Sequence, residues 1–198
     1  MEHTRNIIMS VLTRSFFALF AAAMLGATSS APQVYTLDPI SSSASAKVSF
    51  LGLGSKTARF PKVSGTVRFD ENTPEAVSLD LIIDARALTA HDDVTLKRLK
   101  SEKFFWVDQY PKVTFAGTQL MLTSPTKGTV TGQLTARGVS RQESFTLSFD
   151  KPPLTSVGEA IDVVATTTIN RRNYGMKAYS LIVGKNVEIT MRARLVPR

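Results

Sequence analysis

The stretch NVEITMRARL, residues 186–195, alternates apolar and polar side chains with a period of two. Its apolar members are Val187, Ile189, Met191, Ala193 and Leu195. Because successive side chains of a strand point to opposite faces of a sheet, this pattern predicts a β-strand with one buried and one solvated face. Strands of this kind are typical of antiparallel sheets that pack one face on a core.

The same alternation recurs along the chain and predicts eight strands. They lie near residues 46–54 and at 63–70, 76–84, 112–122, 128–138, 143–150, 159–170 and 186–198. Turn-forming residues such as Gly138 separate most of these strands. Within 112–122 the alternation changes phase near Gly117, which predicts a β-bulge or a bend there.

One segment has a helical pattern instead. Asp92 and Asp93 can cap a helix over residues 94–103, and their charge suits the positive end of its dipole. Leu96 and Leu99 share one face of this helix, while the basic residues around them face solvent. We therefore predict an all-β fold, an antiparallel barrel or sandwich, with one short helix.

Residues 1–30 have a different character. Arg5 and Arg14 precede an apolar run at 16–25, and small residues follow it. This order is typical of a secretory signal peptide, and the run is too short to span a bilayer comfortably. An uncleaved N-terminal anchor is the alternative. We expect residues 1–30 to be removed and residues 31–198 to form one domain, periplasmic or secreted.

The composition limits the chemistry of this domain. The chain has 43% hydrophobic and 20% charged residues, a net charge of +8 and no cysteine. The positive charge favours anionic partners without naming one. Without cysteine there is no disulfide framework, no thiol chemistry and no lipid-modified cysteine anchor.

Catalytic and metal-binding motifs are weak. His91 is the histidine that a Ser-His-Asp site in the domain would need, but no nucleophile-elbow pattern accompanies it. His91, Asp92 and Asp93 are adjacent and lack the spacing of metal ligands. No phosphate-binding loop is present in the sequence. We therefore predict a protein that is not an enzyme and has no metal or cofactor; a hydrolase that uses His91 is an alternative.

The segment LKSEKFFWVDQYPKVTF, residues 99–115, places lysines beside Phe104, Phe105 and Trp106. Such a segment could stack nucleic-acid bases or lie on a membrane. Export argues against nucleic acid, and three consecutive aromatic residues cannot share one helical face. We expect these rings to turn toward the barrel interior, with at most transient membrane contact.

The predicted inner face mixes large apolar residues with small ones, namely Gly65, Gly132, Ala136, Ala165 and Thr167. Eight strands closed into a barrel leave room for side chains or for one small ligand. Small inward residues permit a cavity, but a solid, tapered core fits the same pattern. The residues alone leave both interiors open.

Several motifs together resemble those of a known family. They are YTLDP (35–39), FPKVSGTVRFD (60–70), LKSEKFFWVDQYPKVTF (99–115), GQLTARGVSRQESFTLSF (132–149) and INRRNYGM (169–176). In this order and spacing the chain resembles the YceI-like family of exported proteins, from about Val34 to Leu195. The resemblance implies a lipocalin-like, eight-stranded antiparallel barrel that holds a polyisoprenoid or an isoprenoid quinone and has no enzymatic activity.

Two segments depart from the family pattern. The chain has FLGLGSKTARF at residues 50–60, and it has Asn173 and Tyr174 in the last motif where an acidic residue and another aromatic are familiar. Both departures fall where ligand entry or head-group contact is expected, so they leave the identity of the ligand open.

The resemblance turns the apolar positions into predicted ligand contacts. The predicted wall residues are Phe50, Val67, Phe69, Leu79, Leu81, Ile83, Phe115, Leu134, Phe145, Leu147 and Ile169, and the predicted mouth residues are Phe104, Phe105, Tyr174 and Met176. Arg59, Arg171 and Arg172 are predicted to meet a polar head group, although Arg171 could instead anchor a hairpin. The alternative function is an exported stress-response or interaction module with a solid barrel and no lipid. Association into a homodimer is left open.

Overall fold

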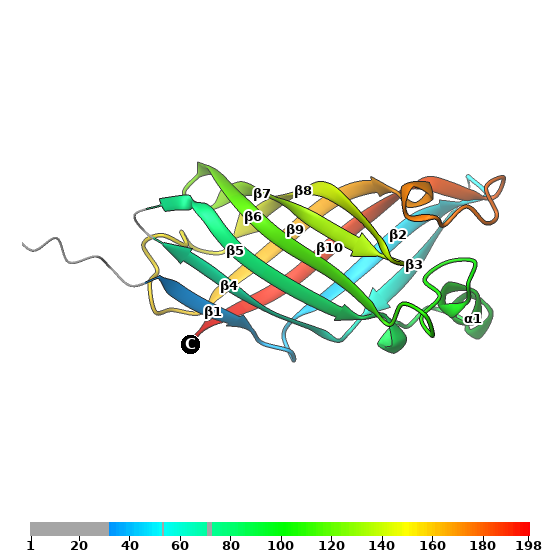
Figure 1. Cartoon of the computed structure of the whole chain (residues 1–198), viewed down its shortest axis with the longest axis horizontal. Helices are drawn as coiled ribbons and strands as arrows, with labels where there is room; N and C mark the ends of the chain where they lie inside the picture. Colours follow the sequence, from blue (N-terminus) through cyan, green and yellow to red (C-terminus); the bar gives the residue numbers. More distant parts are fainter. Residues whose placement is uncertain (1–31, 53, 71–72) are drawn as a thin grey trace, which may run out of the picture.

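The computed structural model describes residues 32–52, 54–70 and 73–198 (Figure 1). The predicted signal peptide, residues 1–30, lies outside the described residues. The strands are β1 (Gln33–Leu37), β2 (Ser43–Phe50), β3 (Gly54–Phe60), β4 (Val63–Asp70), β5 (Thr73–Asp84), β6 (Lys112–Ser124), β7 (Lys127–Ala136), β8 (Val139–Phe149), β9 (Ile161–Asn170) and β10 (Val183–Pro197). The helices are α1 (Asp93–Lys100) and the short 3₁₀ helices η1 (Ala85–Ala87) and η2 (Arg171–Tyr174).

The strands form one antiparallel sheet that closes into a barrel with eight strand positions. β1 and β2 occupy a single position, because β10 pairs with both: Leu195 lies opposite Leu37, and Met191 lies opposite Ala44. β3 and β4 share the next position in the same way. The predicted eight-stranded antiparallel barrel with one short helix is confirmed.

β1 and β3 were not among the predicted strands. β1 is only five residues long, and β3 (GSKTARF) contains few large apolar residues, so neither shows a clear alternation. The outer edge of β3 is covered by the chain that follows β5, since Arg59 and Thr89 exchange two backbone hydrogen bonds of 2.9 and 2.8 Å. Covering an edge in this way removes a site for pairing with other chains.

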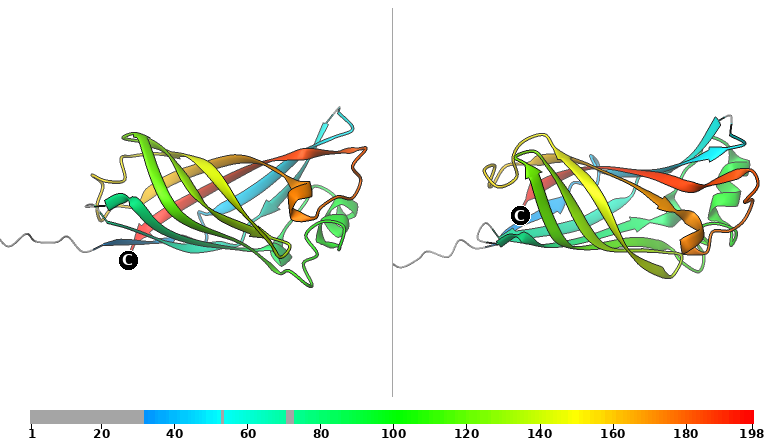
Figure 2. Two further views of the ribbon diagram at one scale, coloured as in Figure 1. Left: turned by 45° about the horizontal axis from the view of Figure 1, so that its top comes forward. Right: turned by 90° about the horizontal axis from the view of Figure 1, so that it is seen from above.

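The barrel is longer than it is wide, and its two ends differ (Figure 2). We call the end that carries α1, η2 and the β2–β3 turn the helix end. The opposite end, which carries the β6–β7 and β8–β9 connections and the last residues of β10, is the far end (Figure 1). The helix end brings together segments that are far apart in the sequence.

The predicted irregularity at Gly117 is confirmed. The register between β6 and β7 shifts between Gly117 and Gln119, and Gly132 pairs directly with Gly117. A Cβ atom on Gly132 would lie 2.2 Å from the carbonyl oxygen of Ala116. The two strands can approach this closely only because neither glycine has a side chain, and a bulge of this kind increases local bending.

α1 begins as predicted, but it is shorter. The carboxylate of Asp92 accepts a hydrogen bond of 2.7 Å from the amide of Thr95, so Asp92 is the N-cap. The helix ends at Lys100 instead of Lys103, because Ser101 adopts an extended conformation and the next residues form tight turns. No helix within the described ranges is long and apolar enough to cross a membrane.

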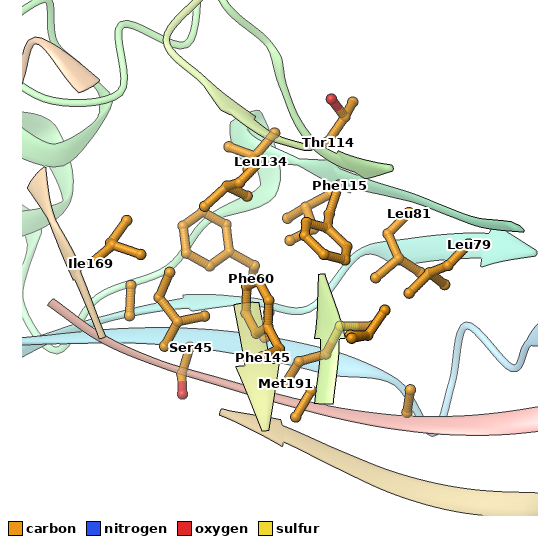
Figure 3. A pocket seen from close by; sticks show the side chains of 18 of the residues that line it. Ser45, Phe60, Leu79, Leu81, Thr114, Phe115, Leu134, Phe145, Ile169 and Met191 are labelled. Carbon is orange, nitrogen blue, oxygen red and sulfur yellow. The ribbon is translucent and has the colours of Figure 1, made fainter. Parts of the chain in front are cut away.

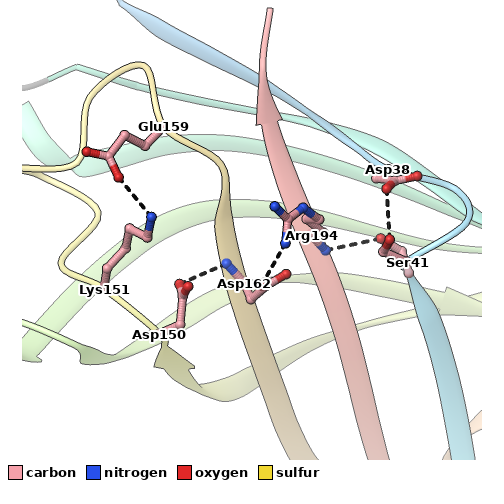
Figure 4. A network of polar contacts seen from close by, with 8 residues as sticks. Asp38, Ser41, Asp150, Lys151, Glu159, Asp162 and Arg194 are labelled. Carbon is pink, nitrogen blue, oxygen red and sulfur yellow. Dashed lines mark hydrogen bonds and ion pairs between the residues drawn. The ribbon is translucent and has the colours of Figure 1, made fainter.

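A loop between β8 and β9 covers the far end of the barrel, and polar contacts fasten its base (Figure 4). Lys151 pairs with Glu159 at 2.8 Å, and the Asp162 amide donates to the Asp150 carboxylate at 2.8 Å. Arg194 on β10 pairs with Asp162 at 3.0 Å. Leu154, from the middle of this loop, reaches the barrel interior.

Candidate functional site

A cavity of about 210 Å³ extends through the barrel interior (Figure 3). Its lining reaches from Leu37 and Leu154 at the far end to Leu99 and Phe105 at the helix end, and every strand contributes to it. Because so small a volume is spread along the whole barrel, the cavity is a narrow channel and not a wide cup. Its shape suits a long, thin molecule.

The lining is almost entirely apolar. Of the lining residues that the structure describes, six carry a nitrogen or oxygen in the side chain, namely Ser45, Lys56, Thr57, Thr114, Arg171 and Tyr174. The other positions are aliphatic, aromatic, methionine or proline, and they extend along the whole channel. Such a wall favours hydrocarbon over polar ligands, since transfer of apolar surface out of water drives binding.

Aromatic rings narrow the middle of the channel. Phe60, Phe115 and Phe145 lie close together there, with Leu79 and Leu81 beside them (Figure 3). The rings of Phe115 and Phe145 meet at 68° with centroids 4.9 Å apart. This edge-to-face geometry is a favourable arrangement of aromatic rings. The rings therefore form a defined constriction.

The predicted mouth residues come from two segments at the helix end. Phe104 is buried and Phe105 is half-buried, and both line the channel, as do Tyr174 and Met176. The ring centroids of Phe105 and Phe60 are 5.4 Å apart, so Phe105 extends the aromatic constriction toward the helix end.

The prediction that all three consecutive aromatic rings turn inward is wrong for Trp106. This residue is 37% exposed and its backbone has a φ of 50°. The left-handed conformation directs its side chain outward, where it packs edge-on against Tyr110 at 5.7 Å and lies 5.8 Å from the Arg137 guanidinium. Trp106 holds the loop in place from outside.

Arg171 has the geometry of a structural anchor. Its side chain is 3% exposed, and its guanidinium donates to the carbonyls of Met176, Val183 and Gly184, the last two at 2.9 and 2.8 Å. Burial, and to a lesser degree Arg172, lowers the pKa of Arg171 from its ordinary value. With all three nitrogens bonded to carbonyls of the loop and of the start of β10, the anchoring role that the sequence left open is favoured.

A short helix closes an opening between β8 and β9. These strands pair only over Thr146–Phe149 and Val163–Thr166, and they separate toward the helix end. η2 lies there: the Tyr174 hydroxyl donates to the Glu143 carboxylate at 2.7 Å, and Arg141 donates to the Asn173 carbonyl at 3.0 Å. Burial and Glu143 raise the pKa of Tyr174 well above its usual value. η2 thus takes the place of the missing strand contacts.

Two connecting residues were missed by sequence reasoning. Arg137, in the β7–β8 turn, donates to the carbonyls of Gly175 and Glu102 and so joins η2 to the loop after α1. The ring of Tyr179 stacks on that of Phe104, with ring centroids 6.0 Å apart. The cationic groups of Arg98 and Lys103 each lie 5.5 Å from the centre of the Tyr179 ring. An arginine immediately before a turn glycine, as at Arg137 and Gly138, is only a weak indication of a contact between loops. No sequence pattern indicated the role of Tyr179.

All fifteen predicted ligand-binding residues except Phe50 line the channel. Phe50 is half-buried near the β2–β3 turn, beside the ammonium of Lys56 at 5.6 Å. Arg59 and Arg172 are exposed and lie outside the lining. That any of these residues contacts a ligand stays a prediction.

His91 is exposed in the loop before α1 and does not line the channel. Within residues 32–52, 54–70 and 73–198, no group of three or more acidic or histidine side chains is placed to hold a metal ion.

Comparison with known proteins identifies the family. Residues 35–195 match the YceI-like domain. A UPF0312 protein of Pseudomonas putida (strain GB-1) is 29% identical over 173 residues, which cover 84% of this chain and 89% of the relative.

Two solved structures share the fold. BcnA of Burkholderia cenocepacia has a TM-score of 0.69 at 21% identity, covering 80% of this chain and 98% of that one. A polyisoprenoid binding domain from Saccharophagus degradans, implicated in plant cell wall breakdown, has a TM-score of 0.65 at 18% identity, covering 83% and 98%. With the domain match spanning nearly the whole barrel, the chain belongs to the YceI-like family.

Proposed function

We propose that this protein binds one long apolar molecule, a polyisoprenoid or an isoprenoid quinone, inside its barrel and does not catalyse a reaction. The observation that carries the proposal is the continuous, narrow and apolar channel. Each buried CH₂ group of a ligand gains roughly 0.8 kcal/mol, so a long prenyl chain binds firmly with few polar contacts. This interior supports a carrier over the solid barrel that the alternative function requires.

The family supports the same class of ligand. One structural relative is described as a polyisoprenoid binding domain, and its fold matches over most of this chain. We further propose that the protein works in the periplasm or after secretion, as the signal-like residues 1–30 suggest.

The charged groups of the lining favour a ligand with a neutral head. Lys56 and Arg171 are the two charged residues in the described part of the lining, and both have partners within the protein. Lys56 pairs with Asp92 at 3.0 Å, and Arg171 donates to three carbonyls. A phosphorylated head would have to compete with these partners, whereas a quinone or an alcohol would not.

Extraction of the purified protein with organic solvent, followed by mass spectrometry, tests the proposal. We expect a stoichiometric prenyl lipid, or its uptake when it is added. The matched variants are Ala165→Phe, which fills the channel from β9, and Thr166→Phe, which adds the same ring on the exposed face of the same strand. Ala165→Phe should reduce bound lipid at least tenfold and Thr166→Phe should not.

Repeated absence of lipid, together with no uptake of added prenyl lipids, would refute the carrier function and leave the interaction module. Equal lipid content in both variants would place the ligand outside the channel.

A further inference from the structure

Among the described residues, two leucine side chains project into solvent at the helix end. Leu181, in the loop before β10, is 101% exposed, and Leu51, in the β2–β3 turn, is 57% exposed. The Leu51 amide donates to the Ile182 carbonyl at 2.8 Å, so the two turns lie side by side. They form the outermost tip of this end of the barrel (Figures 1 and 2). We call Leu51 and Leu181 the leucine tip.

The backbone at the tip adopts conformations that do not favour large side chains. Leu51 has a φ of 55°, and Tyr179, two residues before Leu181, has a φ of 54°. Glycine suits such left-handed positions and leucine does not. An apolar side chain that is both strained and exposed contributes nothing to the core, and strain of this kind tends to occur at functional sites.

The segments that carry the tip are basic and contain no acidic residue. Neither residues 39–69 nor residues 171–187 include Asp or Glu. Cations surround the tip: Arg98 and Lys103 lie against Tyr179, and the Arg172 guanidinium donates to the Ser180 carbonyl at 3.5 Å. Lys177 and Lys185 are exposed in the same loop region.

Two carboxylates near these segments have cationic partners. Asp92 pairs with Lys56 at 3.0 Å, and Glu188 pairs with Lys47 at 3.6 Å. The far end is different, because Asp38, Asp150, Glu159 and Asp162 lie among its basic residues (Figure 4). The exposed Ile40 is close to Asp38, because the backbone amide of Ile40 donates a hydrogen bond of 2.9 Å to the Asp38 carboxylate. The described Ile40 thus lies beside a carboxylate, whereas Leu51 and Leu181 lie in segments that contain no acidic residue.

We propose that the helix end docks on an anionic lipid surface. Leu51 and Leu181 enter the boundary between head groups and acyl chains, while Arg98, Lys103, Arg172, Lys177 and Lys185 contact lipid phosphates. Lys56 and Arg171, the charged residues of the channel lining, lie at this same end, so docking brings this end of the channel to the lipid. The inference does not depend on which molecule fills the barrel.

Sedimentation with vesicles tests the inference. We expect the protein to bind vesicles of phosphatidylglycerol and phosphatidylcholine, to bind pure phosphatidylcholine at least tenfold more weakly, and to dissociate as salt is raised. The double variant Leu51→Gly with Leu181→Ser should weaken binding at least tenfold. Glycine favours the left-handed backbone at residue 51, so this variant keeps the fold, as an unchanged thermal unfolding curve would show. Ile40→Ser, at a 94% exposed site beside Asp38, is the control and should bind like the parent protein.

Three results would overturn the inference. They are equal binding to neutral vesicles, unchanged binding of the double variant, and a dimer of the parent protein that the double variant abolishes. The last would show that the leucine tip joins two copies of the chain. Lipid extraction is a separate measurement, so a protein without a bound prenyl lipid can still dock, and a carrier can still fail to dock.

Discussion

At the scale of single residues, buried polar groups at the helix end organise the loops. Arg171 donates to three backbone carbonyls, and Tyr174 donates to Glu143 across the β8–β9 opening. An unpaired buried polar group lowers the stability of the folded state. Removal of either side chain therefore destabilises the protein, because its hydrogen-bond partners remain without a donor. Both residues stabilise the wall of the channel and need not touch a ligand.

Tyr174→Phe should lower the free energy of unfolding by roughly 1–2 kcal/mol, because it removes the hydrogen bond to Glu143 and keeps the ring. The folded protein raises the pKa of Tyr174, so this group stabilises the fold below its ordinary pKa of 10.0 and loses that contribution as pH rises above it. Urea unfolding from pH 9 to pH 11 should therefore show a shallower loss of stability in Tyr174→Phe.

A double-mutant cycle with Glu143→Gln separates this pair from the rest of η2. If the effects of the two variants simply add, the hydroxyl and the carboxylate do not stabilise each other, and the prediction fails.

At the scale of elements, the paired glycines determine how β6 and β7 bend. A Cβ on Gly132 would meet backbone atoms of β6, and backbone cannot move aside as a flexible side chain can. The neighbouring cross-strand pair, Phe115 opposite Leu134, faces the channel. The bend thus positions part of the constriction.

Gly132→Ala should destabilise the protein by roughly 1–3 kcal/mol through this steric conflict. Gly54→Ala is the matched control, because nothing lies within 4 Å of the Cβ it would add, and its effect should stay near zero. Urea midpoints of the two variants check the prediction, and equal midpoints would show that the close approach is not required.

Elements with clear alternation were predictable, and those held by distant partners were not. The apolar face of β10 and the cap at Asp92 follow from local sequence, since strand periodicity and helix capping are local effects. The outward turn of Trp106 depends on a left-handed backbone, and the role of Arg171 depends on carbonyls up to 13 residues away. η2 could not be foreseen as a replacement for strand pairing, because the separation of β8 from β9 is a property of the whole sheet.

At the scale of the whole molecule, the barrel encloses its apolar channel within a single closed sheet. A ligand inside it contacts every strand, and binding therefore favours the folded state over the unfolded chain. A ligand in the channel should consequently raise the free energy of unfolding of the whole barrel.

Addition of a prenyl lipid to lipid-free protein should raise the melting temperature by roughly 5–10 °C when the free ligand reaches about 100 times its Kd. The shift should grow with ligand concentration and be absent in Ala165→Phe. Calorimetry with the Thr166→Phe control checks it; an unchanged melting temperature of the parent protein at saturating lipid would contradict binding to the folded barrel.

The order of the strands has a consequence for how the chain folds. Neighbouring strand positions are also neighbours along the sequence, except at the seam where β10 meets β1 and β2. β10 is the last strand to leave the ribosome, so the edges of β2 and β9 stay unpaired until synthesis is complete. Closure then requires contacts between residues as far apart as Tyr35 and Pro197, a step that is slow because of the long loop it must close. Until that seam closes, the nascent protein exposes strand edges of the kind that chaperones protect from aggregation.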